Sequence, residues 1–162
     1  METIKINIKH RVTGDVLFSY EKKDNTIQDT AEEAIRTGAN LKGANLEGAK
    51  NVPYIPMNCP SDGAFTAWKK VGNYLVKLEI PADAKRSSAT SMKCRADKAL
   101  VIAITTLNEK TDIAEVTNHD YTPLVYKVGE MVYPDSFDDN RWNECSHGIH
   151  FFINKQDAID YV

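Results

Sequence analysis

Cys-Ser-His-Gly-Ile-His-Phe-Phe, residues 145–152, is the stretch around which the fold of this 162-residue chain is organised. A polar, acidic run over residues 134–144 leads into it, and the apolar residues that follow predict a short strand over 149–153. A closing helix is predicted over 155–161. Strand, turn and closing helix commonly place one polar side chain at the floor of a cleft, and His150 lies in that position.

Four further segments ahead of this stretch have the composition of strands. Residues 99–105 are β-branched and apolar, which predicts a strand buried on both faces. Residues 125–132 predict one strand around a Val-Gly turn, the polar segment 82–91 predicts a loop, and Asn154 is the expected cap of the closing helix. The predicted strands are 64–70, 73–80, 99–105, 125–132 and 149–153.

The first forty residues predict a smaller module. Isoleucines alternate with polar residues and Thr13-Gly14-Asp15 supplies a turn, which together predict a β-hairpin over 4–20. Residues 25–37 then predict a helix, because apolar side chains recur on one face. Asn25 or Thr26 can cap its first turn.

An internal repeat follows, with Ala-Asn-Leu-Lys-Gly over 39–43 and Ala-Asn-Leu-Glu-Gly over 44–48. It resembles the pentapeptide-repeat family, whose units place a central Leu inside a square, right-handed β-coil. Two units make less than one turn of such a coil, so the segment is interpreted as a vestigial linker or a one-turn ledge packed on the next domain. Pro53, Pro56 and Pro60 then mark a boundary, because proline disfavours helices and central strands.

These elements predict an α+β fold in three parts. The first is a hairpin–helix module over 1–38. The second is a pentapeptide-repeat remnant with a proline-rich linker over 39–58. The third is a small, mostly antiparallel and β-rich α+β domain over 59–162.

Composition indicates a cytoplasmic protein without a membrane partner. The 42% hydrophobic and 27% charged content is ordinary for a soluble globular chain. No apolar run approaches the ~20 residues that span a bilayer, and no signal peptide precedes the hairpin. Three widely spaced cysteines predict reduced thiols rather than a disulfide framework.

Charge is unevenly distributed along the chain. The net charge of −3 argues against a dedicated nucleic-acid binder. Residues 69–98 nevertheless carry eight basic and three acidic residues, whereas 109–144 carry nine acidic and three basic ones. This pattern fits two solvated faces, a self-complementary surface, or a small anion pocket with an acidic rim. The odd cysteine count and the lone hairpin leave dimerisation open.

The pattern of potential ligands and nucleophiles predicts no metal, no cofactor and no catalytic residue. Cys145, His147 and His150 lack the paired spacing of zinc ligands, and on a strand the first two share one face while His150 takes the other. Cys145 beside His147, or Cys94 beside basic residues, are alternative thiol nucleophiles without an evident oxyanion site. The sequence favours a binding protein over an enzyme.

A small anionic ligand suits the residues around the last strand. Gly148 allows close approach of the backbone, and His150 is expected to project between aromatic neighbours. Arg141 and Trp142 can supply a guanidinium and a stacking surface for a phosphate or a base. A core strand with one hydrogen-bonded histidine is the alternative. The predicted ligand-binding residues are His150, Arg141, Trp142, Arg86, Arg95, Lys93 and Trp68.

Over nearly its full length the chain resembles a family found mainly in bacteriophages and their bacterial hosts. Its members carry an N-terminal hairpin, a few A-N-L-x-G pentapeptides and a C-terminal domain of unassigned function. The resemblance implies a phage or prophage origin. It is carried by residues 13–20, 39–48, 59–65, 93–96 and 145–152.

A local resemblance connects the last strand with ADP-ribosyltransferases. Gly148-Ile149-His150-Phe151, with Ala158 and Tyr161, is similar to their G-I-Y-F…A-x-x-Y segment, in which the aromatic residue stacks on the nicotinamide of NAD. His150 replaces that tyrosine, no H-G pair precedes the motif in a fitting strand, and no strand bearing the catalytic glutamate follows it. The resemblance therefore implies a cleft for a nucleotide-like molecule in an inactive or permuted enzyme.

Three functions follow as hypotheses. In the first, the protein captures a small anionic nucleotide, such as a host immune signal, in the host cytoplasm. In the second, it docks a host protein through the hairpin and the pentapeptide ledge. In the third, it processes NAD or an ADP-ribosyl group with His150 and either Glu79 or Glu144.

Overall fold

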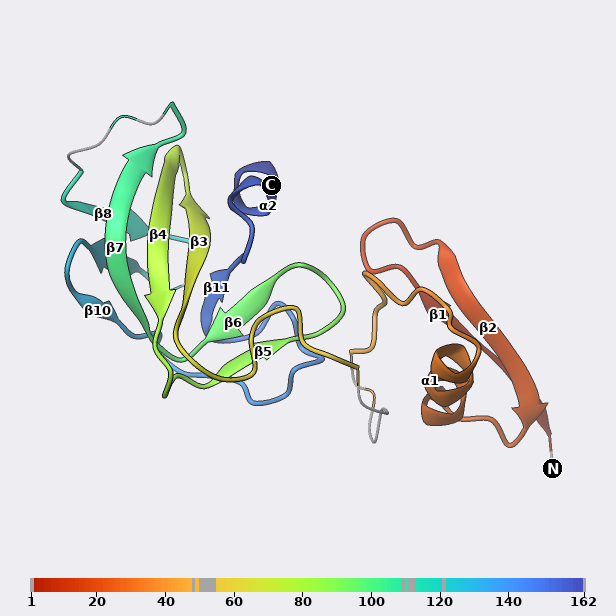
Figure 1. The fold of residues 1–162 in the computed structure, drawn as a ribbon. Coiled ribbons are helices and arrows are strands. Elements are labelled where there is room, and N and C mark those ends of the chain that lie inside the picture. The colour runs from red at the N-terminus through yellow and green to blue at the C-terminus, as the bar shows by residue number, and fades with distance from the viewer. Residues whose placement is uncertain are drawn as a thin grey trace.

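The computed structural model describes residues 2–47, 49, 55–108, 110, 113–120 and 122–161. The hairpin and first helix form one part, and a β-rich domain that closes with the second helix forms the other (Figure 1). All paired strands are antiparallel, which confirms the α+β, β-rich prediction. Among the described residues no helix is long and apolar enough to cross a membrane.

The N-terminal hairpin joins β1 (Thr3–Lys9) to β2 (Val16–Lys23), and α1 (Ile27–Arg36) packs on it. Thr26 is the N-cap: its hydroxyl accepts from the backbone N–H of Asp29, and the Asp29 carboxylate accepts from the backbone N–H of Thr26. This reciprocal capping box confirms the predicted helix start.

The two repeat units complete the core of this module. Leu41, Ala44 and Leu46 are buried in one cluster with Ile8 of β1 and the alanines of α1. In each unit the asparagine side chain accepts from the backbone N–H two residues later, so both units make the same tight turn. The segment also donates from the Gly43 N–H to the Thr90 carbonyl, which ties it to the β-rich domain.

The β-rich domain contains a four-stranded sheet in the order β10-β7-β4-β3 and a three-stranded sheet in the order β11-β6-β5. Two backbone hydrogen bonds between Trp68 and Phe152, each 2.8 Å, join the edges of the two sheets. The strands are β3 (Phe65–Val71), β4 (Tyr74–Ile80), β5 (Arg86–Ser88), β6 (Cys94–Ala96), β7 (Ala99–Thr106), β10 (Met131–Val132) and β11 (Ile149–Phe151).

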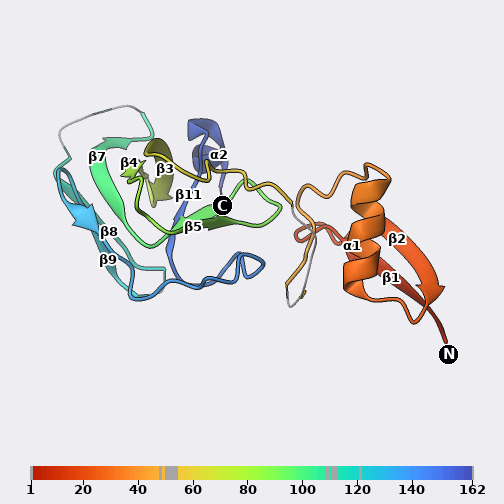
Figure 2. The ribbon, with the colours of Figure 1, turned by 60° about the horizontal axis from the view of Figure 1, so that its bottom comes forward.

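Separate elements cover the two faces of the four-stranded sheet. The hairpin of β8 (Glu115–Asn118) and β9 (Leu124–Lys127) packs Val116 and Tyr126 into the main core on one face. On the other face, α2 (Lys155–Asp160) packs Ala158 against the sheet through Leu75 and Phe152. Figure 2 shows the β8–β9 hairpin and α2 on different sides of β3 and β4. The Asn154 side chain caps α2 as predicted.

Several sequence predictions for this domain are wrong in detail. Residues 82–91 are not wholly a loop, because β5 forms there through pairing with β6. The predicted strand 125–132 is two strands in different sheets, since Gly129 takes a φ of +85° and turns the chain between them. β8 was not predicted. In β7 one face is not fully covered, and Ile102 keeps 39% of its surface exposed.

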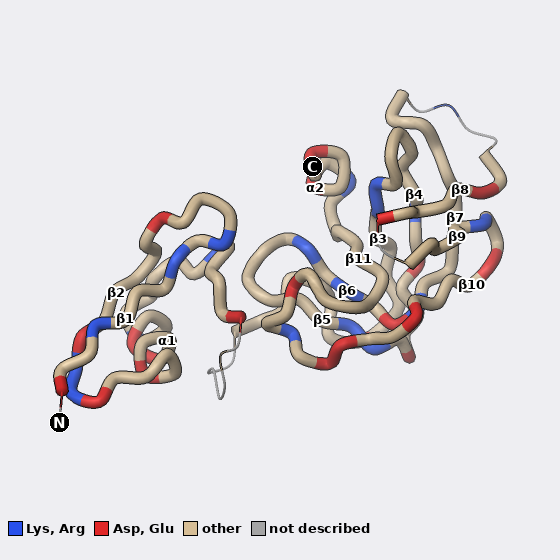
Figure 3. The backbone as a smooth tube through the Cα atoms, turned by 180° about the vertical axis from the view of Figure 1, so that it is seen from behind, with Lys and Arg blue, Asp and Glu red and all other residues tan. Residues whose placement is uncertain are grey.

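The basic middle and the acidic end of the chain face each other within the molecule. Lys85 pairs with Asp139 at 3.5 Å, and the Arg95 guanidinium donates to the carbonyl of Asp138 at 3.1 Å. Figure 3 shows the resulting mixture of basic and acidic segments around β5 and β6. The basic and acidic segments therefore meet around β5 and β6, and the self-complementary surface stays a prediction.

Candidate functional site

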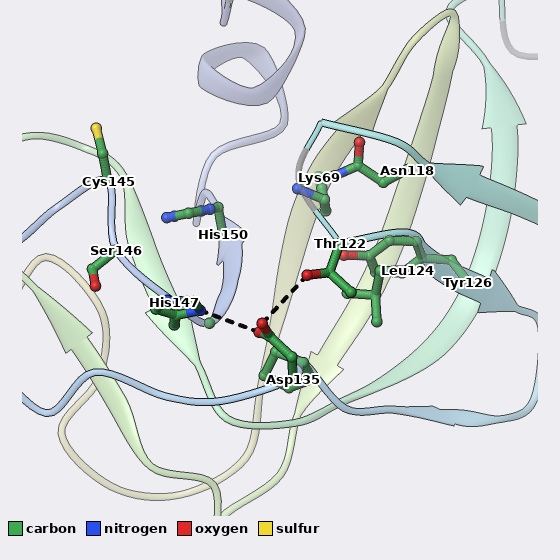
Figure 4. Close-up of a pocket in the computed structure, with 12 residues that line it drawn as sticks. Lys69, Asn118, Thr122, Leu124, Tyr126, Asp135, Cys145, Ser146, His147 and His150 are labelled. Carbon is green, nitrogen blue, oxygen red and sulfur yellow. Dashed lines mark hydrogen bonds and ion pairs between the residues drawn. The ribbon is translucent and has the colours of Figure 1, made fainter.

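A cavity of about 320 Å³ opens between the β8–β9 hairpin, β3 and the start of β11 (Figure 4). Its size falls at the lower end of the range for small-molecule sites. The lining residues are Lys69, Asn118, Thr122, Leu124, Tyr126, Pro134, Asp135, Cys145, Ser146, His147, Gly148 and His150.

Lys69 brings a positive charge into this cavity from the buried face of β3. Phe65, Ala67 and Val71 share that face by strand alternation and belong to or pack against the main core. Lys69 is only 8% exposed, and it makes no hydrogen bond or ion pair with any residue that the structure describes. Burial lowers the pKa of its ammonium from 10.5 to about 8, with nearby Lys93 acting in the same direction and Asp120 opposing it.

His150 lies beside Lys69 and is neutral at physiological pH. Burial is the largest cause that lowers its pKa to about 3, and the charges of Lys93 and Lys69 lower it further. Its Nε2 lies 3.1 Å from the Glu144 carbonyl oxygen, which can only accept, so in the neutral ring Nε2 carries the proton. Nδ1 is then the unprotonated, accepting nitrogen.

Tyr126 supplies a second polar group without a partner. The side chain is fully buried, and its hydroxyl oxygen has no hydrogen-bond partner in the described part of the chain. Burial raises the pKa of this phenol, so the hydroxyl stays protonated and can donate. Lys69 Nζ lies 6.0 Å from the centre of the Tyr126 ring, and both residues line the same cavity. A buried hydrogen-bond donor without an acceptor lowers stability, unless a ligand or a water molecule accepts its hydrogen bond.

Three hydrogen-bonded polar side chains lie at the rim of the cavity. His147 Nδ1 lies 3.3 Å from an Asp135 carboxylate oxygen, and the other oxygen accepts from the Thr122 hydroxyl at 3.3 Å. The dashed lines in Figure 4 join these three side chains across the mouth of the cavity. The hydrogen bond from His147 lowers the pKa of Asp135, which keeps a negative charge at the rim.

A second cavity of about 560 Å³ adjoins the first on the side of α2. Lys69 and His150 line both cavities and therefore separate them. The second cavity adds one cationic, one acidic and two aromatic side chains to the lining, which are Lys70, Asp120, Phe152 and Tyr161. Phe152 and Tyr161 form a tilted ring pair with centroids 5.2 Å apart.

The three arginines that sequence analysis assigned to a ligand instead bind backbone carbonyls. Arg86 donates to the carbonyls of Gly63 and Pro81, each at 2.7 Å. Arg95 is 2% exposed and holds the carbonyls of residues 138, 140 and 147, which fixes the loop before β11. Arg141 donates to the carbonyls of residues 55, 88 and 89. None of the three lines either cavity.

The other predicted residues are dispersed. Trp68 points to the opposite face of β3 from Lys69 and lies under Lys77 and Lys155. Trp142 packs against the core of the N-terminal module. Lys93 reaches the rim of the first cavity indirectly, because its Nζ donates to the thiol of Cys145 at 3.1 Å. Of the seven predicted residues, His150 alone lines the cavities.

The cysteines and histidines give no metal site among the described residues. Cys145 and His147 lie in the turn before β11 and not on a strand, so the predicted sharing of one strand face is wrong. All three cysteines are free, as expected. Cys94 is fully buried, and its contact with Cys59 together with burial raises the pKa of its thiol.

Sequence reasoning missed Lys69, although a signal for it was present. Lys69 continues the alternation of Phe65 and Ala67 and precedes Val71, so it occupies an inward position of the strand. A lysine at an inward strand position is unusual unless it has a specific role. Tyr126 and Asp135 gave no comparable signal, because their meeting depends on how the β8–β9 hairpin folds over the sheet.

Comparison with known proteins gives a single assignment. No significant match was found among curated proteins or among solved structures. Residues 55–158, which include β3 to β11 and the first four residues of α2, match the family described as "Family of unknown function (DUF5758)". Because this span is more than half of the chain, the protein belongs to the DUF5758 family, whose function is unknown.

Proposed function

We propose that this protein binds a small anionic, nucleotide-like ligand in the two cavities separated by Lys69 and His150. The observation that carries the proposal is Lys69, whose side chain is largely buried, lines both cavities and has no anionic partner within 4.0 Å among the described residues. A buried, unpaired cation lowers stability and is normally compensated by an anion. An anionic ligand supplies that compensation.

The remaining lining residues favour a ligand of nucleotide type. The Tyr126 hydroxyl and the Lys69 ammonium are donors suited to phosphate or carboxylate oxygens. In the second cavity, Phe152 and Tyr161 offer aromatic surface beside Lys70. Aromatic surface next to cations is the combination that stacks a base and neutralises its phosphates. A host immune signal derived from a nucleotide is one member of this class.

The positions of Glu144 and Glu79 support binding of the ligand without its cleavage. Glu144 accepts from the backbone N–H groups of Thr90 and Ser91 and pairs with Arg11, so its carboxylate is held away from His150. Glu79 lies on the face of β4 opposite to Lys69, because it shares register with Thr66. Neither acid is placed to assist His150 in acting on NAD.

A ligand panel tests this proposal. NAD, ADP-ribose, cyclic ADP-ribose isomers and cyclic dinucleotides are titrated by calorimetry, and each ligand is identified by mass spectrometry after heat release. We expect one member to bind and to return intact, with the Lys69→Met variant weakened about 10- to 100-fold, the loss typical of one charged hydrogen bond. Lys77→Met is the matched control, because Lys77 lies on the other face of the sheet.

Two results would contradict the proposal. Cleaved ligand would indicate an enzyme acting on NAD or ADP-ribose. Absence of binding across the panel, or equal binding by the Lys69→Met variant, would leave the N-terminal hairpin and repeat units as the surface to examine for a protein partner.

A further inference from the structure

We propose that Lys69 is a carbonyl-reactive amine that forms a reversible imine with an aldehyde or ketone carried by the anionic ligand. The inference rests on the proposed function, because it names the chemistry of the ligand in the same two cavities. It is drawn from the placement of one amine, one hydroxyl and one neutral imidazole around the same space (Figure 4).

Lys69 differs from three other buried or partly buried lysines of the domain in having no hydrogen-bond or ion-pair partner among the described residues. Lys70 donates to the carbonyls of Ile159 and Tyr161, Lys93 donates to the Cys145 thiol, and Lys98 pairs with Asp83 at 2.6 Å. Each of these amines therefore has a hydrogen-bond or ion-pair partner on the protein. Lys69 has no such partner in the described ranges, and burial together with the charge of Lys93 outweighs Asp120, which opposes loss of its proton.

The pKa of about 8 for Lys69 makes this state accessible near neutral pH. A neutral amine with a lone pair is the nucleophile in imine formation, and lysines desolvated in apolar pockets are activated in this way. The lining of the first cavity by Leu124 and Tyr126 supplies the apolar surroundings on one side of the amine.

The neighbouring groups account for the protons of the reaction. The Lys69 nitrogen forms a bond to the carbonyl carbon while the carbonyl oxygen takes up a proton, for which the Tyr126 hydroxyl is a donor in the same lining. The carbinolamine nitrogen then gives one proton to His150 Nδ1, which passes it to the hydroxyl oxygen as the C–O bond breaks, so that water leaves. The remaining N–H proton returns to the Tyr126 oxygen, and the product is a neutral C=N bond between Lys69 and the ligand. Water reverses the same steps, so the ligand is returned intact.

Reductive trapping tests the inference with a small probe. Glyoxylate, which joins an aldehyde to a carboxylate, is incubated with the full-length protein and cyanoborohydride, and modified lysines are located by peptide mass spectrometry. We expect Lys69 to be modified about tenfold faster than exposed lysines at neutral pH, because its lower pKa leaves more neutral amine. The rate should rise as pH passes through about 8 and then level off.

Pyrophosphate binding by the wild type, measured beside the trapping, separates this inference from the proposed function. Arginine cannot form the imine, so the Lys69→Arg variant should lose the adduct, whereas the control Lys77→Arg, on the other face of the sheet, should keep it. Pyrophosphate binding by the wild type with no Lys69 adduct would overturn the inference alone. Modification spread evenly over surface lysines would also overturn it. A Lys69 adduct without pyrophosphate binding would instead contradict the anion site.

Discussion

At the scale of single residues, the protein is distinguished by buried polar groups that lack internal partners. Lys69 and Tyr126 are both more than nine-tenths buried, and neither is hydrogen-bonded to a described residue. Most buried polar groups in folded proteins are paired, because an unpaired one costs about 1–3 kcal/mol. Both residues line one cavity, and the proposed anion site rests on that placement.

His150 makes the stability of the protein sensitive to acid. Its pKa falls from 6.5 in the unfolded chain to about 3 in the fold, so between these values the unfolded state binds more protons and stability decreases as pH falls. From pH 7.5 to pH 4.5 this group alone should remove about 2–3 kcal/mol. The measurement is urea unfolding of the wild type and of His150→Gln, which keeps a donor for the Glu144 carbonyl but does not titrate.

We expect the wild type to lose about 2–3 kcal/mol more than His150→Gln over that pH range. The exposed His119→Gln change is the control and should follow the wild type. Equal losses of unfolding free energy in the wild type and in His150→Gln would show that His150 is not held neutral in the fold.

At the scale of elements, the loop before β11 positions the candidate site, and hydrogen bonds from Arg95 fix the conformation of that loop. Arg95 donates to three of its carbonyls, and the Asp138 carboxylate accepts from Asn143 and from the backbone of Asn140. Gly148 ends the loop at a φ of +134°, where an added Cβ would lie 3.2 Å from the Phe137 ring. The loop therefore reaches β11 in one conformation, which sets the position of His150.

The Arg95→Met change should loosen this loop. Three carbonyls lose a charged donor, so we expect the free energy of unfolding to fall by about 2–4 kcal/mol. Thermal or urea unfolding checks the loss. Lys85→Met removes only an exposed pair with Asp139 and should leave stability nearly unchanged. Equal effects of the two changes would contradict the structural role given to Arg95.

The elements differ in how far sequence could predict them. Local patterns sufficed for α1 and α2, whose caps Thr26 and Asn154 are formed within a few residues of the chain. β5 and β8 escaped prediction because they are short and exist through pairing with β6 and β9. The arginines were assigned to a ligand because guanidinium groups favour phosphate, whereas distant carbonyls, invisible in the sequence, are their partners.

At the scale of the whole molecule, one buried ion pair connects the N-terminal module with the β-rich domain. Arg11, at the end of the hairpin, places Nε 3.2 Å from an oxygen of Glu144, whose side chain is 3% exposed. Glu144 also binds the backbone N–H groups of Thr90 and Ser91, and its own carbonyl faces His150. The module is thereby connected to the loop that carries the site.

The Arg11→Met change should release the module without unfolding the domain. Glu144 would keep its two backbone donors but lose its cation, which costs about 3–5 kcal/mol for a buried pair and less where the arginine is partly exposed. Hydrogen exchange is the measurement. The Gly43 N–H, which donates to Thr90 of the other part, should exchange faster, while the Trp68 N–H between the sheets should not change. Acceleration of both would indicate global destabilisation, and Arg36→Met in α1 is the neutral control.

The protonation of Lys69 is the quantity on which the proposed anion site depends, and nuclear magnetic resonance can follow it. The ¹³Cε signals of the lysines are titrated with pH, with and without inorganic pyrophosphate, and Lys69→Met identifies the signal. We expect one lysine to titrate near pH 8, and its pKa to rise when pyrophosphate binds, because an anion favours the charged amine. If Lys69 titrates like a surface lysine, at about 10.4, or if pyrophosphate leaves its pKa unchanged, the cavity is not an anion site.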